Sequence, residues 1–259
     1  MPNSAVVNYH ITSPEPQAFH IDADGEAGKL VSPELVPASI SVSDVRGDDV
    51  SVDFSDDSLA FVRHASAIRD FDDRREWVGA YERELGDLLK EQIAAKEVVV
   101  FDHTVRIDDL SSGRKPARNV HSDYSPKGAH QRLRDLLGAE RAEAWEASHF
   151  AFVNAWRPVG HSINSAPLGF VRPNSVSPQD WITIDLVYPD RTGQIMGLAR
   201  NDDHDWFYRS RMTPDDIAIF NIYDNRGRPS IAHSALDLIE NNSVQVKRMS
   251  IESRTLVRY

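Results

Sequence analysis

One histidine and one aspartate, two positions apart, have a spacing that suits metal binding: Val120-His121-Ser122-Asp123. On a β-strand, residues i and i+2 point to the same face, so this imidazole and this carboxylate can reach one ion. A second imidazole, His233, lies in a later predicted strand. Two histidines and one carboxylate can bind Fe(II) on one side and leave coordination positions open. The sequence therefore predicts a metal site formed by His121, Asp123 and His233.

The same His-x-Asp pattern also occurs at His20-Ile21-Asp22, so the triplet alone is a weak signal. The order of the later residues separates the two triplets. His121 and Asp123 precede a strand-rich region that carries His233, and Arg248-Met249-Ser250 follows fifteen residues later. The guanidinium and hydroxyl of Arg248 and Ser250 would share one strand face and suit the distal carboxylate of a small dicarboxylic cosubstrate.

A second Arg-x-Ser triplet, Arg228-Pro229-Ser230, precedes His233 within a predicted turn, and we expect it to be part of a loop. The order His-x-Asp, then His, then Arg-x-Ser is the pattern of enzymes that use Fe(II), 2-oxoglutarate and O2.

The elements that must position these residues are mostly strands. Apolar residues at three- and four-residue steps predict a helix within 73–96, and a strand over 97–101 follows. A second helical stretch covers about 127–146, where Gly138 is a candidate interruption. The strands predicted after residue 148 are His149–Trp156, Pro167–Val171, Trp181–Tyr188, Gln194–Ala199, Trp206–Arg209, Ile217–Tyr223, Ser230–Ser234 and Arg248–Val257.

About eight short strands behind a helical region predict a mainly β fold with flanking α-helices, a double-sheet jelly roll or barrel. The expected organisation is a single domain, 1–259. Residues 1–60 contain short alternating pieces, including 39–42 and 50–54, and are expected to be extended and to wrap the core.

The amino-acid composition excludes or disfavours several classes of partner and site. The 259 residues carry 40 acidic and 29 basic side chains, a formal charge of −11, which disfavours nucleic acid and anionic membranes as partners. There is no cysteine, so thiolate metal sites and cysteine nucleophiles are excluded. No secretory signal and no membrane-spanning apolar run is visible, and we expect a soluble, cytoplasmic protein that acts on a small molecule.

Several longer segments carry a resemblance beyond the metal pattern. In chain order they are Val120-His121-Ser122-Asp123-Tyr124, Val153-Asn154-Ala155-Trp156-Arg157-Pro158, Ala166-Pro167-Leu168, His204-Asp205-Trp206-Phe207-Tyr208, Ile222-Tyr223-Asp224 and Arg248-Met249-Ser250-Ile251-Glu252-Ser253-Arg254. Over roughly 95–257 the chain resembles the oxygenase family that includes the fungal gibberellin desaturase and the CmcJ-type cephamycin-tailoring protein.

This resemblance implies a double-stranded β-helix (cupin-like) core over 95–257, with a helical insert near 127–146. It also implies that His121, Asp123 and His233 are iron ligands and that Arg248 and Ser250 bind 2-oxoglutarate. The implied reaction is oxidation of a small metabolite, usually in natural-product biosynthesis, by hydroxylation, desaturation or oxidative cyclisation. The chain keeps the family's Glu-x-Arg at Glu252 and Arg254, but has Asp205 where arginine is common.

Further residues are candidates for cosubstrate or substrate contact, each with a structural alternative. Asn154 could bind 2-oxoglutarate or substrate, or be an inward polar group satisfied by the backbone. Arg157 could meet a substrate carboxylate or form an ion pair. The aromatic candidates are Tyr124, which would point away from Asp123, and Trp156, Trp206 and Tyr208, which could instead be core. Glu252 and Arg254 complete the set of possible substrate contacts.

Two other functions remain open from the sequence: a cupin-like metalloenzyme that does not use 2-oxoglutarate, and a non-catalytic jelly-roll binding protein. A Ser-His-Asp hydrolase does not fit, because the chain has no Gly-x-Ser-x-Gly elbow. The identity of the substrate and the oligomeric state are not predicted.

Overall fold

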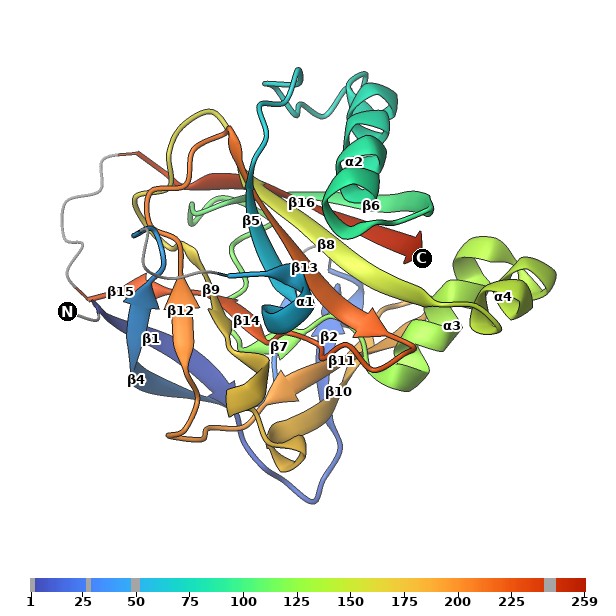
Figure 1. The fold of residues 1–259 in the computed structure, drawn as a ribbon. Coiled ribbons are helices and arrows are strands. Elements are labelled where there is room, and N and C mark those ends of the chain that lie inside the picture. The colour runs from blue at the N-terminus through green and yellow to red at the C-terminus, as the bar shows by residue number, and fades with distance from the viewer. Residues whose placement is uncertain (1–2, 27–28, 48–51, 240–245) are drawn as a thin grey trace.

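A computed structural model of the chain describes residues 3–26, 29–47, 52–239 and 246–259 (Figure 1). The strands are β1 (Asn3–His10), β2 (Gln17–Ile21), β3 (Leu30–Val31), β4 (Leu35–Asp44), β5 (Leu59–Arg63), β6 (Glu97–Ile107), β7 (His121–Ser122), β8 (Phe150–Pro158), β9 (Leu168–Val171), β10 (Trp181–Val187), β11 (Thr192–Leu198), β12 (Trp206–Tyr208), β13 (Asp216–Asp224), β14 (His233–Ala235), β15 (Asp237–Leu238) and β16 (Met249–Arg258). The α-helices are α1 (Phe54–Asp57), α2 (Val78–Ile93), α3 (Pro126–Leu137) and α4 (Ala139–Glu146), and short 3-10 helices span Ala23–Gly25, Pro173–Ser175 and Pro178–Asp180.

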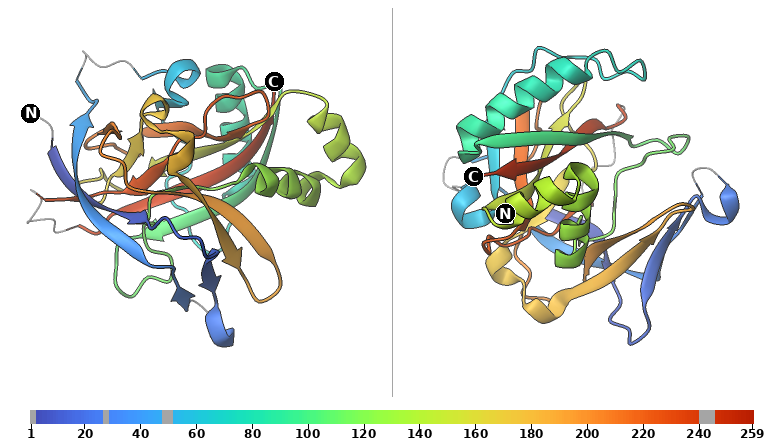
Figure 2. Two further views of the ribbon diagram at one scale, coloured as in Figure 1. Left: turned by 90° about the horizontal axis from the view of Figure 1, so that it is seen from below. Right: turned by 90° about the vertical axis from the view of Figure 1, so that its right-hand side faces the viewer.

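The strands form two sheets that face each other. The larger has eleven strands in the order β15-β1-β4-β12-β9-β14-β7-β11-β10-β2-β3, and the smaller has five in the order β5-β13-β8-β16-β6. Most neighbouring pairs are antiparallel. Figure 2 shows β10 and β11, together with β2 and β3, extending away from the body of the molecule. The predicted double-stranded β-helix, a mainly β fold with flanking helices, is confirmed.

The interior lies between the two sheets because strand side chains alternate. On β8, Phe152 and Trp156 point inward and pack with Phe170 and Phe220, which come from both sheets. Val153 and neighbouring odd-numbered residues of β8 point outward, against α2. The predicted helix within 73–96 is α2, which buries one stripe over the small sheet: Tyr81, Leu85, Leu88, Leu89 and Ile93.

A β-bulge in β6 decides which residues of that strand face inward. Arg254 pairs with Asp102 and the next residue, Thr255, pairs with Val100, so Phe101 is the extra residue on β6. Before the bulge, the odd-numbered residues of β6 pack into the interior. Beyond it, His103 packs outward on Tyr81 of α2. The even-numbered residues beyond the bulge therefore face the interior.

Several predicted boundaries differ from the observed ones. The strand expected to end at Phe101 continues to Ile107, and the helical stretch 127–146 is divided into α3 and α4 at Gly138, whose φ of 75° suits glycine. Of the piece 50–54 expected to be extended, residues 50 and 51 lie outside the described residues. Phe54 instead begins α1, because the Asp53 side chain caps that helix by accepting a hydrogen bond from the backbone N–H of Ser55.

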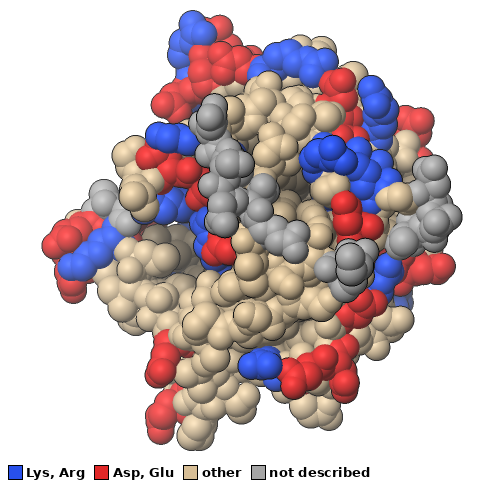
Figure 3. Space-filling model, turned by 90° about the vertical axis from the view of Figure 1, so that its left-hand side faces the viewer, with Lys and Arg blue, Asp and Glu red and all other residues tan. Residues whose placement is uncertain are grey.

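Of the N-terminal segment 1–60 expected to wrap the core, β1 to β4 belong to the eleven-stranded sheet, while β5, which begins at Leu59, belongs to the five-stranded sheet. Figure 3 shows one face of the molecule, on which acidic and basic side chains are interspersed. Among the described helices, none is long and apolar enough to span a bilayer. The cytoplasmic location stays a prediction.

Gly197 gives a test of packing beside the candidate metal site, because it pairs with His121 across β11 and β7. A Cβ atom at position 197 would lie 2.5 Å from Cδ2 of the buried His10 ring. We expect Gly197→Ala to lower the free energy of unfolding by about 1–3 kcal/mol through overpacking, measured by chemical denaturation. Gly193→Ala, also on β11 but with no atom nearer than 3.8 Å, is the matched control. Equal stability of the two variants would contradict this packing.

Candidate metal centre

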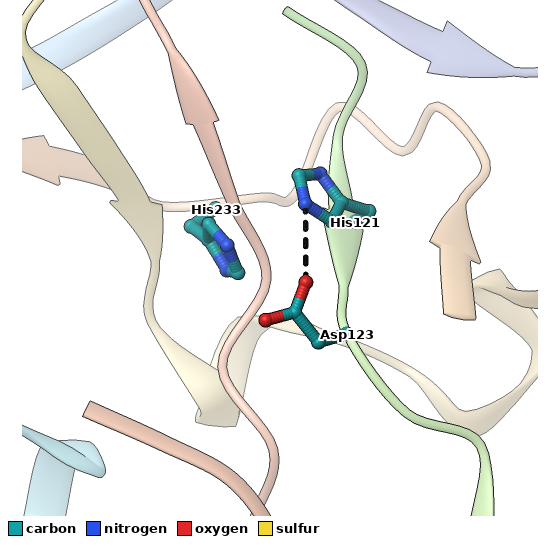
Figure 4. A group of neighbouring side chains, drawn as sticks. All are labelled: His121, Asp123 and His233. Atoms are coloured by element: carbon teal, nitrogen blue, oxygen red, sulfur yellow. Dashed lines mark ion pairs between the residues drawn. The ribbon is translucent and has the colours of Figure 1, made fainter. Parts of the chain in front are cut away.

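His121, Asp123 and His233 come together between the sheets (Figure 4). Their donor atoms all lie within 4.8 Å of one another, and among the described residues this is the one group of three or more histidine, aspartate or glutamate side chains with such spacing. His121 lies on β7 and pairs directly with His233 on β14, so both imidazoles leave the sheet on the same face. Asp123 follows β7 directly, and its Oδ1 is 3.7 Å from Nε2 of His121.

Backbone contacts prepare both imidazoles for metal binding. Nδ1 of His121 lies 2.8 Å from the carbonyl of Asn119, and Nδ1 of His233 lies 3.4 Å from the carbonyl of Ile231. A proton on Nδ1 leaves the Nε2 lone pair free for a metal. Burial and, to a smaller extent, His233 lower the pKa of His121 to about 4, and burial also lowers the pKa of His233. Both rings are therefore neutral at neutral pH, the form that coordinates metal ions.

Asp123 is held by residues of the opposite sheet. Asn154 Nδ2 donates to Oδ2 at 2.7 Å, and Nε of Arg254 donates to the same oxygen at 3.1 Å. Burial alone would raise the pKa of Asp123, but Arg254 and the two histidines hold it well below its usual range. Oδ2 is thus occupied by protein donors, while Oδ1 faces His121.

Arg254 lies among three carboxylates. Besides Asp123, its guanidinium contacts Asp102 Oδ2 at 2.6 Å and Glu252 Oε1 at 2.6 Å. Burial would lower the pKa of Arg254, yet the three carboxylates raise it well above its ordinary value. Arg254 and Glu252 were predicted as possible substrate contacts; in this structure they are bound to each other, and Arg254 is also bound to Asp123.

A cavity runs from the two histidines to Arg248. Its lining includes Trp156, Leu168, Ala235 and Glu252. Arg248 is 2% exposed, its Nε and Nη1 have no hydrogen-bond partner among the described residues, and Oγ of the buried Ser250 has none either. Unsatisfied buried donors are costly and indicate a missing acceptor. The arrangement fits a carboxylate at Arg248 and Ser250, with a metal at the other end of the cavity.

Three predicted contact residues do not face this cavity. Trp206 and Tyr208 flank Phe207 on β12; Phe207 packs in the interior, so Trp206 and Tyr208 point outward, into the cluster with Val42. Arg157 points to the α2 side, where its guanidinium lies over Tyr81 and near Glu84. The alternating pattern in the sequence predicts that a strand has two faces, but it does not predict which face points into the interior.

The other predicted residues lie in or near the cavity, but only one of them lines it. Trp156 lines the cavity, with the Arg248 guanidinium 5.4 Å from its ring centroid. Tyr124 packs on Phe152, with ring centroids 4.8 Å apart, and does not line the cavity. Asn154, expected to bind 2-oxoglutarate or substrate, instead gives its amide to Asp123.

The two duplicate motifs lie elsewhere. His20 is exposed on β2, and no third donor joins it and Asp22 among the described residues. Arg228 donates to the carbonyl of Phe54, as expected for a loop residue. A residue that the sequence did not single out, Arg106, also lines the cavity. Alternation continued from Phe101 would have placed Arg106 on the outer face, because the β-bulge at Phe101 reverses which residues of β6 point inward.

The chain is similar to several known proteins. A family model described as oxidoreductase/YMDC permease-like domain matches residues 7–258. The hydroxylase/desaturase efuI of Hormonema carpetanum is 29% identical over 248 residues, covering 84% of this chain and 82% of that protein. The alpha-ketoglutarate-dependent dioxygenase phiK of Fungal sp. (strain ATCC 74256) is 28% identical, covering 85% and 83%. The solved structure of a single-residue variant of the iron and alpha-ketoglutarate-dependent endoperoxidase NvfI has the same fold, with a TM-score of 0.89 and 23% identity over 99% of this chain and 96% of that one.

Metal binding distinguishes the two His-x-Asp motifs. We expect the protein to bind one Fe(II), or Co(II) as a probe, and His121→Ala, Asp123→Ala and His233→Ala each to weaken the affinity more than about 100-fold, because each removes a direct ligand. The matched control is the double variant His20→Ala with Asp22→Ala, which should bind as the unaltered chain does. Anaerobic calorimetric titration measures both. If only the control variant loses metal binding, the metal site lies at His20 and Asp22 and the assignment to His121, Asp123 and His233 is wrong.

Proposed function

The chain belongs to the oxidoreductase/YMDC permease-like domain family, and from that membership we propose that it is an Fe(II)- and 2-oxoglutarate-dependent oxygenase of small organic metabolites. The observation that carries this proposal is the cavity that joins two ends of matching chemistry. One end has the donors of His121, Asp123 and His233 within 4.8 Å, and the other has the unpartnered guanidinium of Arg248 beside Ser250. A ligand with a metal-binding head and a distal carboxylate satisfies both ends.

His121, Asp123 and His233 would hold the iron, and Arg248 with Ser250 would bind the distal carboxylate of 2-oxoglutarate. When bound, Fe(II) with 2-oxoglutarate and O2 supplies the oxidising power that breaks a substrate C–H bond, with succinate and CO2 as co-products. The protein orients these groups. Asn154 and Arg254 fix the Asp123 carboxylate, and the Asn119 carbonyl fixes the His121 ring.

The cavity walls support a reaction that is sheltered from water. Trp156 and Leu168 are nearly fully buried, and with Ala235 they form an apolar lining between the charged ends. A dry wall strengthens the interaction between Arg248 and a carboxylate, and it limits side reactions of an oxidant. Trp156 and Glu252 line this cavity, so they remain candidates for substrate contact.

The relatives support oxidation of a natural product. The similar proteins are named as a hydroxylase/desaturase, an alpha-ketoglutarate-dependent dioxygenase and an iron and alpha-ketoglutarate-dependent endoperoxidase. We place this chain among enzymes of natural-product biosynthesis that hydroxylate, desaturate or oxidatively cyclise a small metabolite. The oxidising chemistry that bound iron would supply is compatible with all three outcomes.

Turnover of 2-oxoglutarate tests this function. The Fe(II)-loaded protein should convert 2-oxoglutarate and O2 to succinate and CO2, slowly alone and faster with an accepted metabolite from a panel. Succinate is measured by chromatography with mass detection. Fe(II) binding without any 2-oxoglutarate binding would contradict the proposal and favour a metalloenzyme that does not use this cosubstrate.

Arg248→Ala should raise the 2-oxoglutarate concentration for half-maximal succinate formation roughly 10- to 100-fold, because charge-assisted hydrogen bonds worth about 1.5–3 kcal/mol are lost. The matched control is Arg228→Ala, in the other Arg-x-Ser triplet. Its guanidinium lies over Phe54 and does not line the cavity, so the cosubstrate requirement should not change. An unchanged requirement in Arg248→Ala would overturn the assignment of the carboxylate end.

Asn154→Ala should weaken Fe(II) binding roughly 10-fold, because one of two protein donors to Asp123 Oδ2 is removed and the carboxylate is less firmly oriented. Asn221→Ala is a matched control: Asn221 is buried on β13 and its amide donates to the carbonyls of Arg228 and Pro229. Both variants should lose stability in thermal unfolding. If the two variants also lose the same metal affinity, Asn154 has no specific effect on the site.

A further inference from the structure

Arg106 and Arg248 are two guanidinium groups that line the same cavity as His121 and His233. Neither forms an ion pair with a carboxylate of the described residues, although the whole chain has 40 acidic and 29 basic side chains. Glu252, the acidic side chain in the same lining, is taken by Arg254 at 2.6 Å. Two positive charges therefore meet at this end of the cavity without a counter-ion from the described part of the chain.

Strand register explains why the two guanidinium groups are close together. Arg106 on β6 pairs directly with Ser250 on β16, and directly paired residues extend to the same face of a sheet. Arg248 precedes Ser250 by two residues and shares that face. Arg106 Nη1 donates to the carbonyl of Lys115 at 2.9 Å, and the rest of its guanidinium keeps donor capacity.

Arg248 is buried and Arg106 is half-buried, and two like charges in one cavity lining are unfavourable without an anion between them. Burial and, to a smaller extent, the charge of Arg106 lower the pKa of Arg248 to about 9, so Arg248 still carries its charge at neutral pH. Arg106 is also desolvated, which lowers its pKa. A carboxylate that accepts hydrogen bonds from both side chains removes the repulsion and satisfies the unpartnered donors of Arg248.

We propose that Arg106 binds the distal carboxylate of 2-oxoglutarate together with Arg248 and Ser250, an inference that rests on the proposed function. Two guanidinium groups from neighbouring strands would then recognise one carboxylate. The consequence is selectivity: the site favours a 2-oxo dicarboxylate strongly over a 2-oxo monocarboxylate of the same chain length, and part of that preference belongs to Arg106.

The test compares two ligands in Arg106→Met. Affinities of 2-oxoglutarate and of 2-oxopentanoate, which lacks the distal carboxylate, are measured without turnover by anaerobic titration of the Fe(II)-loaded protein, following the visible charge-transfer absorption. We expect Arg106→Met to weaken 2-oxoglutarate binding by on the order of 10-fold or more and to leave 2-oxopentanoate binding unchanged. Arg106→Lys keeps the charge but loses the planar guanidinium, so its affinity for 2-oxoglutarate should lie between that of the unaltered protein and that of Arg106→Met.

Arg114→Met is the matched control, since Arg114 is exposed and its side chain is outside the cavity lining. If Arg106→Met weakens the binding of both ligands equally, Arg106 only supports the cavity wall. If it weakens the binding of neither, Arg106 does not contribute to binding either ligand. Both results overturn the inference. If Arg106→Met does not fold, Arg106→Lys decides by the same comparison. Absence of 2-oxoglutarate binding in the unaltered, Fe(II)-loaded protein would instead overturn the proposed function itself.

Discussion

The two oxygens of the Asp123 carboxylate have different partners, and the rest of the site depends on this division. Oδ1 faces His121, whereas Oδ2 accepts hydrogen bonds from Asn154 and Arg254. The histidines belong to the large sheet, while Asn154 and Arg254 belong to the small one. A carboxylate shared in this way connects the sheets across their interior. The spacing of the sheets, set by apolar packing around Phe152 and Phe170, therefore determines whether the three candidate ligands converge.

Two arginines on one face, Arg254 on β16 and Arg248 directly before that strand, have different electrostatic roles. Arg254 is neutralised by three carboxylates, so its charge serves to fix Asp123 and is not available to a ligand. Six residues earlier, Arg248 has no such partners and keeps its capacity for an anion. Burying both kinds of arginine is unfavourable unless each finds its counter-charge. The acidic balance of the whole chain does not predict this local field, because the field depends on which side chains the strands turn inward.

Much of the fold could be predicted from the sequence, since alternation and turn residues mark strands directly. The convergence of His121, Asp123 and His233 followed from chain order, which distinguished them from His20 and Asp22. Alternation does not reveal which face is interior, and for this reason Trp206 and Tyr208 were placed at the site although they point outward. The partner of Asn154 could not be predicted either, because hydrogen bonds between side chains of different sheets leave no local pattern.

The extra residue at Phe101 shows how a change in chain length can act on chemistry. Before it, odd-numbered residues of β6 face the interior; after it, Asp102 and Arg106 do, while His103 packs on α2. Deleting a single residue from this strand would turn its inward-facing side chains outward and its outward-facing side chains inward. Insertions and deletions are thus far more disruptive here than substitutions. The number of residues in β6 is therefore expected to stay constant as the sequence changes, whereas changes in length are expected in the loops that join the strands.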